Sequence, residues 1–508
     1  MSTEKPDITA AELSDNSRDV ESADKSAVDT VHTDEAMRVL AAYTGDQTWT
    51  DEEENKLRRK IDWKLMPVLC LTYSLQYYDK AMISQAALFG LREDLDLMVG
   101  NRYSWIASIF YLGFIIGAYP CMYLAQRYPV ERVAAATVFL WGLTLILTTV
   151  CNSYQGVYAQ RFFLGFLESG VSPMFMLIVG SWYRKPEQAM RMGIWYCCTG
   201  YVSIISPLIN YGFGLIGGGV SSWRYMYYFG GALTMVWGVA LLFVLPPDPI
   251  RAKGFNERER YIIVARVRSN NSGVRNMTFK PDQVTDLVTD IKFWLLFSVS
   301  LLSMIANGPI SAFVPLIIRG FGFSQLNSLL LLCPAGFWAG TLMLIFSYLA
   351  FKLKNARTYL IFVAQMGTVL ACLLLWRLPM SSKVGLLFGT TILPSVGAGY
   401  AVLMGLQVAN TAGYTKRSIA SSGIYIGYCL GNFVGPLAFK ADDAPRYPRG
   451  FIIVLITAIV AAVLVIVYRF VCIWENKRRD KAGTAEGFDH AYEDDLTDRK
   501  NPQFRYIM

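Results

Sequence analysis

The chain has 508 residues, of which 54% are hydrophobic and 17% are charged, and its formal net charge is +8. A soluble globular protein carries about 25% charged residues, whereas here the apolar residues form blocks of about 20–25, each long enough to cross a bilayer. This pattern excludes a soluble multidomain protein and predicts an all-α polytopic membrane protein. No apolar segment follows Met1 directly, so we expect the first span to target the chain without a cleaved signal peptide.

The predicted organisation is two six-helix bundles between polar tails. Residues 1–60 form a polar tail that we expect to be disordered and to end in a short basic helix, which a capping box at Thr50 begins. An N-terminal bundle follows over 61–247, then a central loop over 248–291, a C-terminal bundle over 292–474 and a charged tail over 475–508 that we expect to be disordered. Twelve spans are predicted, at 65–90, 103–125, 132–150, 156–181, 192–215, 224–246, 293–318, 325–350, 358–377, 384–408, 418–438 and 450–473.

Basic residues gather in the loops on one side of these predicted spans. They occur at 56–64, 127–132, 184–191, 352–357 and 469–481, and the central loop on the same side is also basic. Because Lys and Arg are retained on the cytosolic side of membrane proteins, both termini are predicted to be cytosolic.

Four charged residues interrupt two of the apolar runs: Asp79, Lys80, Arg161 and Glu168. A charge at the centre of a span costs roughly 2.5–3.5 kcal/mol, so intramembrane charges normally face the protein interior and serve transport. We therefore expect the four to face an internal cavity and to pair there. Arg161 and Glu168 are seven residues apart, two turns along one helix face, which is too far for a direct pair. Asp79 and Lys80 can supply one partner of each sign.

The four charges sum to zero, which suggests a switch. Both histidines lie in the polar tails, so a carboxylate has to carry any transported proton. We assign Glu168 as the principal proton carrier, Asp79 as the second carrier or a gate, Lys80 as the anion contact and Arg161 as the counter-ion to a carboxylate. A proton on one carboxylate would leave a cation unpaired, and an anionic substrate would restore neutrality, so the two binding events are linked. The alternative is a structural ion-pair network that holds the first and fourth helices together.

The C-terminal half offers neutral polar groups instead. A weak internal repeat, AQRYPVER (125–132) against AFKLKNAR (350–357), relates the halves, and the stretches that correspond to the four charges are uncharged. Asn307, Gln407, Asn410 and Asn432 are the polar candidates, which predicts a site charged on one wall and hydrogen-bonding on the other. Asn307 and Asn410 are our candidate substrate contacts, and Asn307 is expected in an unwound turn before Gly308-Pro309.

Enzymatic chemistry has no visible basis in the sequence. No nucleophile–base pair or phosphate loop is apparent, and the nine cysteines fall mostly inside spans without a CxxC pair, which favours packing over metal or disulfide chemistry. We expect no enzyme activity, no metal, no cofactor other than a proton gradient, and no nucleic-acid partner.

Several stretches together carry a family resemblance, among them RRKIDWKLMP (58–67), YYDKAMISQAAL (77–88), RFFLGFLESGVSPMF (161–175) and NTAGYTKRS (410–418). With these the chain, over 58–473, resembles the major facilitator superfamily, and within it the fungal allantoate-permease-like branch of the anion:cation symporter family. Lys80 and Phe229 depart from the family pattern, because many relatives have Arg and Glu at these positions.

The resemblance implies the major facilitator fold, with alternating access between two bundles, and a binding and coupling site at the four intramembrane charges. It also implies proton-driven uptake of a small organic anion across the plasma membrane by a monomer. The implied substrates are ureido acids such as allantoate and ureidosuccinate, monocarboxylates, carboxylated vitamins or small peptides. Export of an organic acid or metabolite, or nutrient sensing without transport, are the alternatives.

Overall fold

The structure is a computed structural model that describes residues 43, 48–216, 219–246, 249, 251–268, 280–483 and 496–508, and these residues form helices without a strand. Most of the predicted disordered tail at 1–60 therefore lies outside the described residues. The N-terminal half contains α3 (Asp51–Ala86), α4 (Leu91–Asp94), α5 (Arg102–Arg127), α6 (Val130–Leu147), α7 (Tyr154–Glu168), α8 (Val171–Trp182), α9 (Lys185–Gly214) and α10 (Ser222–Val244). Between the halves lie α11 (Glu257–Arg268) and α12 (Pro281–Val288). The C-terminal half contains α13 (Ile291–Gly320), α14 (Gln325–Leu330), α15 (Cys333–Lys352), α16 (Arg357–Arg377), α17 (Lys383–Ile392), α18 (Ser395–Ala409), α19 (Tyr414–Leu437) and α20 (Pro448–Ala482).

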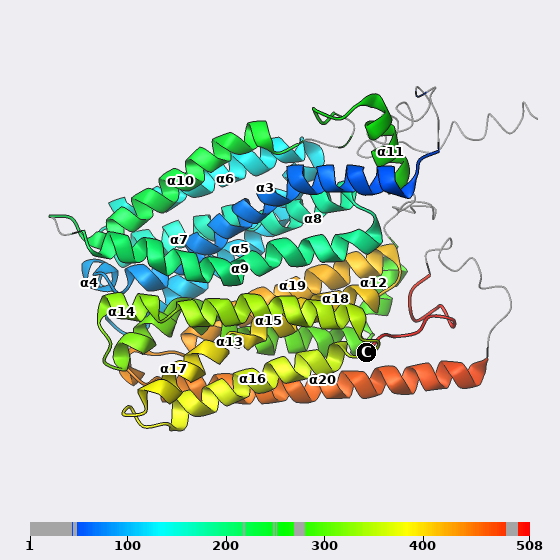
Figure 1. The fold of residues 1–508 in the computed structure, drawn as a ribbon. Helices are drawn as coiled ribbons and strands as arrows, with labels where there is room; N and C mark the ends of the chain where they lie inside the picture. The colour runs from blue at the N-terminus through cyan, green and yellow to red at the C-terminus, as the bar shows by residue number, and fades with distance from the viewer. Residues whose placement is uncertain are drawn as a thin grey trace, which may run out of the picture.

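The two halves lie side by side as two bundles (Figure 1). In the first half α3 packs on α9, α6 on α10 and α5 on α7; in the second half α13 packs on α19, α16 on α20 and α15 on α18. In each half, the first span therefore packs on the fifth, the second on the fourth and the third on the sixth. The weak sequence repeat therefore corresponds to two bundles with a common packing scheme.

Ten helical segments within the described residues are long and apolar enough to cross a membrane. The more polar helices α3 and α19 pack among them, α3 on α9 and α10, α19 on α13 and α5. With these two the described chain contains the twelve predicted spans. The hydroxyl of Thr50 accepts a hydrogen bond from the Glu53 amide at 3.3 Å, as predicted, and the basic helix and the first span form one uninterrupted helix.

Glycines allow the closest helix contacts in the N-terminal half. A Cβ atom on Gly165 of α7 would lie 2.0 Å from the Phe110 carbonyl oxygen of α5, and one on Gly113 of α5 would lie 2.0 Å from the Phe162 carbonyl oxygen of α7. Small residues that let backbones approach are the usual means of helix packing in membranes. They fix α7, and with it Arg161 and Glu168, against α5.

Three predicted spans are each divided into two helices. The fourth is broken at Ser169–Gly170 between α7 and α8, the eighth at Leu331–Leu332 between α14 and α15, and the tenth at Leu393–Pro394 between α17 and α18. In contrast, α13 continues as a helix through Asn307 and Pro309, where we predicted an unwound turn. Its neighbour Gly308 instead provides space, because a Cβ there would lie 2.5 Å from Cδ of Pro436 on α19.

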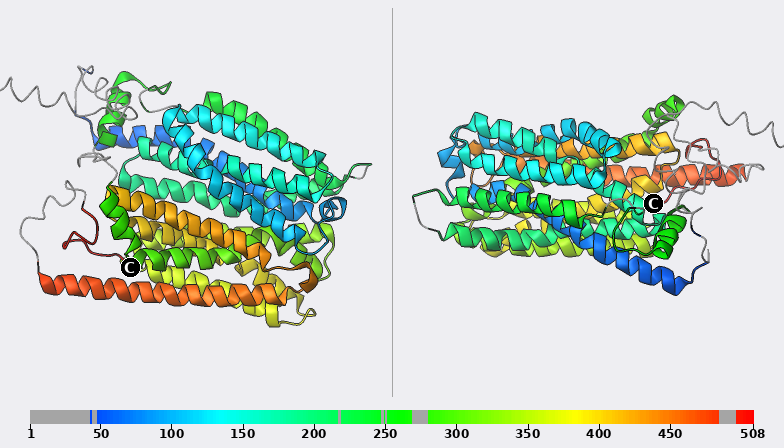
Figure 2. Two further views of the ribbon diagram at one scale, coloured as in Figure 1. Left: turned by 180° about the vertical axis from the view of Figure 1, so that it is seen from behind. Right: turned by 90° about the horizontal axis from the view of Figure 1, so that it is seen from above.

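The prediction of a disordered C-terminal tail over 475–508 is wrong for 475–483 and 496–508, while residues 484–495 lie outside the described residues. Residues up to Ala482 continue α20, and residues 496–508 pack against the C-terminal half, with Asp498 and Tyr506 buried. We call the end of the molecule where α3 begins and α20 ends the tail end, and the opposite end the far end (Figures 1 and 2). The charged composition suggested a solvated tail, but the bundle offers buried partners that composition alone does not reveal.

Candidate substrate and proton site

A cavity lies between the two halves of the molecule. The N-terminal half contributes α3 and α9 to its wall, and the C-terminal half contributes α13, α15, α17, α18 and α19. Polar groups in the lining include Gln76, Tyr77, Lys80, Gln85, Asn307 and Tyr428. Among the described residues that line this cavity, Lys80 is the one charged side chain, so the wall is charged on one side and neutral on the other.

The Lys80 ammonium group is held by aromatic rings. Its Nζ lies 5.0 Å from the ring centre of Phe110, 5.6 Å from Tyr111 and 5.2 Å from Phe114, all on α5. Within the described structure, no carboxylate lies at ion-pair distance from it. Ring faces attract a cation without occupying its hydrogen-bond donors. Lys80 can therefore offer these donors to an anion in the cavity.

Asp79 lies behind the cavity wall and is fully buried. Its Oδ2 accepts hydrogen bonds from Nε1 of Trp141 at 2.8 Å and from Oγ1 of Thr234 at 3.1 Å, while Oδ1 has no hydrogen-bond partner in the described part of the chain. Gly230 makes room for this carboxylate, since a Cβ there would lie 3.3 Å from Oδ1. Asp79 thus joins α3 to α6 and α10.

Arg161 and Glu168 are also buried, on α7. Nη2 of Arg161 donates to the Tyr227 hydroxyl at 2.6 Å. Glu168 is the last residue of α7, and its backbone oxygen accepts a hydrogen bond from Nε2 of Gln76 at 3.1 Å. Among the described residues, no group meets hydrogen-bond geometry with either carboxylate oxygen of Glu168; its polar neighbours are the cations Lys80 and Arg161 and the amide of Gln76.

The prediction that the four charges pair directly inside the cavity is therefore wrong. No two of them form an ion pair in the described part of the chain, and Lys80 is the member that reaches the cavity lining. Their neighbours include Trp141, Tyr227 and Thr234. Sequence reasoning missed these because aromatic and hydroxyl residues in spans look the same whether they pack or hold a charge.

The two predicted asparagine contacts lie in different places. Asn307 lines the cavity and donates to Oδ1 of Asn432 at 2.7 Å. Asn410 lies at the tail end, where Nδ2 donates to the Tyr468 hydroxyl and to the Ile507 carbonyl oxygen, each at 2.7 Å. The prediction that Asn410 shares a substrate site with Asn307 is therefore corrected, since its amide is occupied by other groups of the chain.

A buried hydrogen-bond chain that we did not predict also reaches the cavity. The Tyr78 hydroxyl bonds Asn210 at 2.9 Å, Asn210 bonds Gln85 at 2.5 Å, and Gln85 bonds Ser206 at 2.8 Å. It joins α3 to α9 beside Asp79 and presents the Gln85 amide to the cavity. The available signal was the presence of amide side chains inside apolar spans.

The far end of the cavity is bridged between the halves. The Tyr103 hydroxyl donates to the Ala312 carbonyl oxygen at 2.7 Å, and the Ser104 hydroxyl donates to the Phe439 carbonyl oxygen at 2.7 Å. These bonds connect α5 with α13 and with the end of α19. A two-bundle membrane fold around a central polar cavity is typical of a secondary transporter.

Comparison with known families agrees with this class. The family model described as Major Facilitator Superfamily matches residues 69–436. The chain belongs to this superfamily of transporters, and it is a multi-pass membrane protein rather than an enzyme.

Named relatives place it among fungal transporters. It is 32% identical to the allantoate permease of Saccharomyces cerevisiae, covering 94% of this chain and 90% of the permease. It is 34% identical to the MFS-type transporter cnsL of Penicillium expansum, covering 93% and 92%, and 31% identical to the thiamine pathway transporter THI73 of S. cerevisiae, covering 92% and 89%. The crystal structure of a D-xylose–proton symporter has the same fold, with a TM-score of 0.61 at 14% identity over 79% of this chain and 96% of that one.

Proposed function

We propose that the protein is a proton-coupled symporter that takes up a small organic anion. One observation carries this proposal: within the described residues, Lys80 lines the cavity without a carboxylate at ion-pair distance, and the buried carboxylate of Glu168, which has no ion-pair or hydrogen-bond partner there, is an electrostatic neighbour of this lysine. Lys80 supplies the anion contact, and Glu168 supplies the proton site.

The coupling follows from the charge balance. With Glu168 ionised, its negative charge offsets the field of Lys80 and Arg161 and weakens anion binding. A proton on Glu168 removes that offset, so the cavity becomes more attractive to an anion. A bound anion in turn favours the proton by the same free energy. Both ligands then cross together when the bundles exchange access.

The remaining charges have supporting roles. Asp79 is a second proton carrier, or a gate that links α3 to α6 and α10 through Trp141 and Thr234. Arg161 balances the buried carboxylates while Tyr227 fixes its guanidinium. Asn307 is positioned to hydrogen-bond a polar group of the substrate.

The substrate class comes from the relatives. Allantoate is a ureido acid, and one relative is named for its transport, so a ureido acid, a monocarboxylate or a carboxylated vitamin is our proposed substrate. Basic residues gather at the tail end, such as Arg58, Arg184 and Lys416, and by the positive-inside rule they support a cytosolic location of this end. The plasma membrane and a monomeric working unit complete the proposal.

The test is uptake of labelled allantoate, nicotinate and ureidosuccinate by cells that express the protein, at acidic and at neutral external pH. We expect concentrative uptake of at least one anion that is faster at the lower pH and is abolished by a protonophore. Efflux alone would indicate the exporter. Saturable binding without flux would indicate the sensor.

A further inference from the structure

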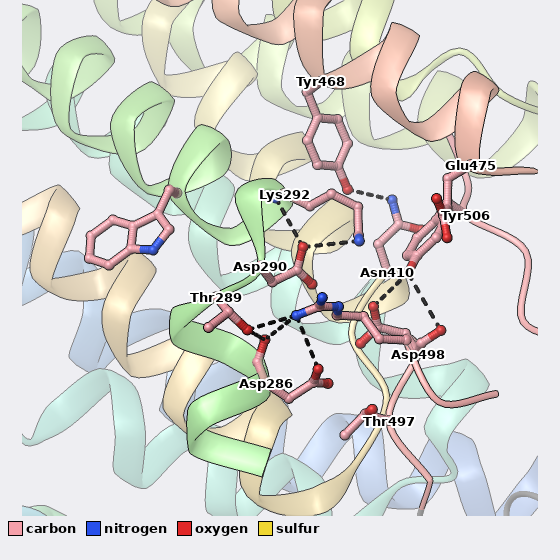
Figure 3. Close-up of polar contacts among 12 residues, drawn as sticks. Asp286, Thr289, Asp290, Lys292, Asn410, Tyr468, Glu475, Thr497, Asp498 and Tyr506 are labelled. Atoms are coloured by element: carbon pink, nitrogen blue, oxygen red, sulfur yellow. Dashed lines mark hydrogen bonds and ion pairs between the residues drawn. The ribbon is translucent and has the colours of Figure 1, made fainter. Parts of the chain in front are cut away.

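The carboxyl-terminal segment, residues 496–508, lies over the tail end of the C-terminal half and has a built docking surface there (Figure 3). Asp498 of the segment, 1% exposed, forms an ion pair with the buried Nζ of Lys416 at 2.8 Å. Arg499 reaches α12, where it donates to Oγ1 of Thr289 at 2.7 Å and lies 3.2 Å from a carboxylate oxygen of Asp286. The segment therefore docks through charge as well as packing.

Arg479, near the end of α20, organises the turn of the segment. Its guanidinium donates to the carbonyl oxygens of Asp498 at 2.9 Å, Asn501 at 3.0 Å and Phe504 at 2.8 Å. The Tyr506 hydroxyl accepts a fourth bond at 3.2 Å. A single buried side chain thus satisfies backbone acceptors along most of the segment.

The last residues of the segment hold the tail end of α18. Asn410 follows this helix and exchanges two hydrogen bonds with Ile507, each of 2.7 Å. α18 begins after the break at Leu393–Pro394, and Pro394 and Gly397 line the cavity. The segment therefore holds one end of α18, and the other end of this helix is the break at Leu393–Pro394 beside the cavity. Breaks of this kind are typical hinge positions.

Each anchor of the segment has a second partner within the bundle. Lys416 also contacts Asp286 at 3.3 Å and Asp290 at 2.9 Å, while Arg479 contacts Glu475 at 3.3 Å.

Asn410 likewise bonds Tyr468 of the bundle, whereas the second partner of Asp498, the Tyr506 hydroxyl at 2.7 Å, lies inside the segment. Lys292 pairs with Asp290 at 2.9 Å. The docking surface therefore keeps three acids, Asp286, Asp290 and Glu475, against three bases, Lys292, Lys416 and Arg479. Breaking a buried ion pair is usually costly because it leaves one buried charge without a partner. Release of the segment avoids this cost, because each buried charge of the docking surface keeps a partner of opposite sign.

We propose that residues 496–508 are a reversible latch. When docked, the latch restrains α18 and the α18–α19 loop; when released, it lets α18 move about its break and open the tail end of the cavity. If the segment were docked permanently, its buried partners would need its charges in order to be neutralised. Here they are neutralised by the bundle itself. This latch does not depend on the nature of the transported solute.

Hydrogen–deuterium exchange on the purified full-length protein in lipid nanodiscs tests the latch without a substrate. Two variants release it: a chain that ends at Asp495, and Arg479→Ala. Arg505→Ala is the matched control, because Arg505 lies in the same segment, its ion pair within the described residues is with the exposed Asp480, and its other hydrogen bonds stay inside the segment, to the carbonyl oxygens of Pro502 and Phe504. If the truncated chain does not fold, the Asp498→Asn variant takes its place. It removes the charge of Asp498 but leaves Lys416 two carboxylate partners, Asp286 and Asp290.

We expect exchange over 400–412 to be roughly tenfold faster in the releasing variants, the effect of losing about one charged hydrogen bond. Exchange in α16 and in the N-terminal half, and the exchange of the Arg505→Ala control, should not change. In the wild-type protein the Tyr506 and Ile507 amides should exchange much faster than the core of α16. Equal loss of protection through the whole C-terminal half, no change at 400–412, or core-like protection of those two amides would overturn the proposal.

Discussion

Replacing Lys80 with methionine tests the cavity directly. Methionine keeps the length of the side chain and its packing against the rings of Phe110, Tyr111 and Phe114, but it removes the charge that lines the cavity. A hydrogen bond to a charged group contributes about 1.5–3 kcal/mol, and each 1.4 kcal/mol is about tenfold in affinity. The apparent KM for the anion should therefore rise about 10- to 100-fold.

The assay is the concentration dependence of labelled-anion uptake for wild type, Lys80→Met and Lys80→Arg, with equal amounts of protein at the cell surface. Lys80→Arg should retain binding within a few-fold, because it keeps the charge. Lys383→Met is the matched control, since Lys383 also lies over an aromatic ring, that of Phe323, but outside the cavity lining. An unchanged KM in Lys80→Met would refute the assignment of Lys80 as the anion contact.

Two further predictions concern stability. Gly165→Ala would place a Cβ 2.0 Å from a backbone oxygen of α5, so it should lower the free energy of unfolding by at least about 1–3 kcal/mol. Gly193→Ala, where the Cβ would meet open space, should not lower it. Thermal unfolding in detergent compares the two variants. Burial raises the pKa of Asp290, but Lys292 and Lys416 outweigh it and hold that pKa below its usual range. Its contribution to stability should be present at neutral pH and be lost as the pH falls below about 4, and Asp290→Asn should reduce this acid-dependent part of the unfolding curve.

Much of the fold was predictable because the bilayer imposes a strong length rule. Apolar runs gave the twelve spans and the division into halves, and Thr50 gave the start of α3. Helix breaks were not predictable in detail. Gly308-Pro309 suggested a break where α13 is continuous, because the neighbouring α19 packs against it.

The lining of the cavity was predictable in part. Lys80 and Asn307, which the sequence singled out, do line the cavity, whereas the roles assigned to Asp79, Arg161 and Glu168 stay predictions. Which groups hold these charges depends on helices distant in sequence, which no local pattern specifies. Asn410 was assigned to the wrong place for the same reason: its partners come from α20 and from the C-terminal segment.

The central claim is that Glu168 carries the proton, and the pH dependence of uptake in Glu168→Gln tests it most directly. Wild-type protein and a Glu131→Gln control should take up the labelled anion faster as the external pH falls. Glu168→Gln, which mimics the protonated form, should still bind the anion and exchange it across the membrane, but its rate should not depend on pH and it should not concentrate the anion. Wild-type pH dependence and accumulation in Glu168→Gln would contradict the account.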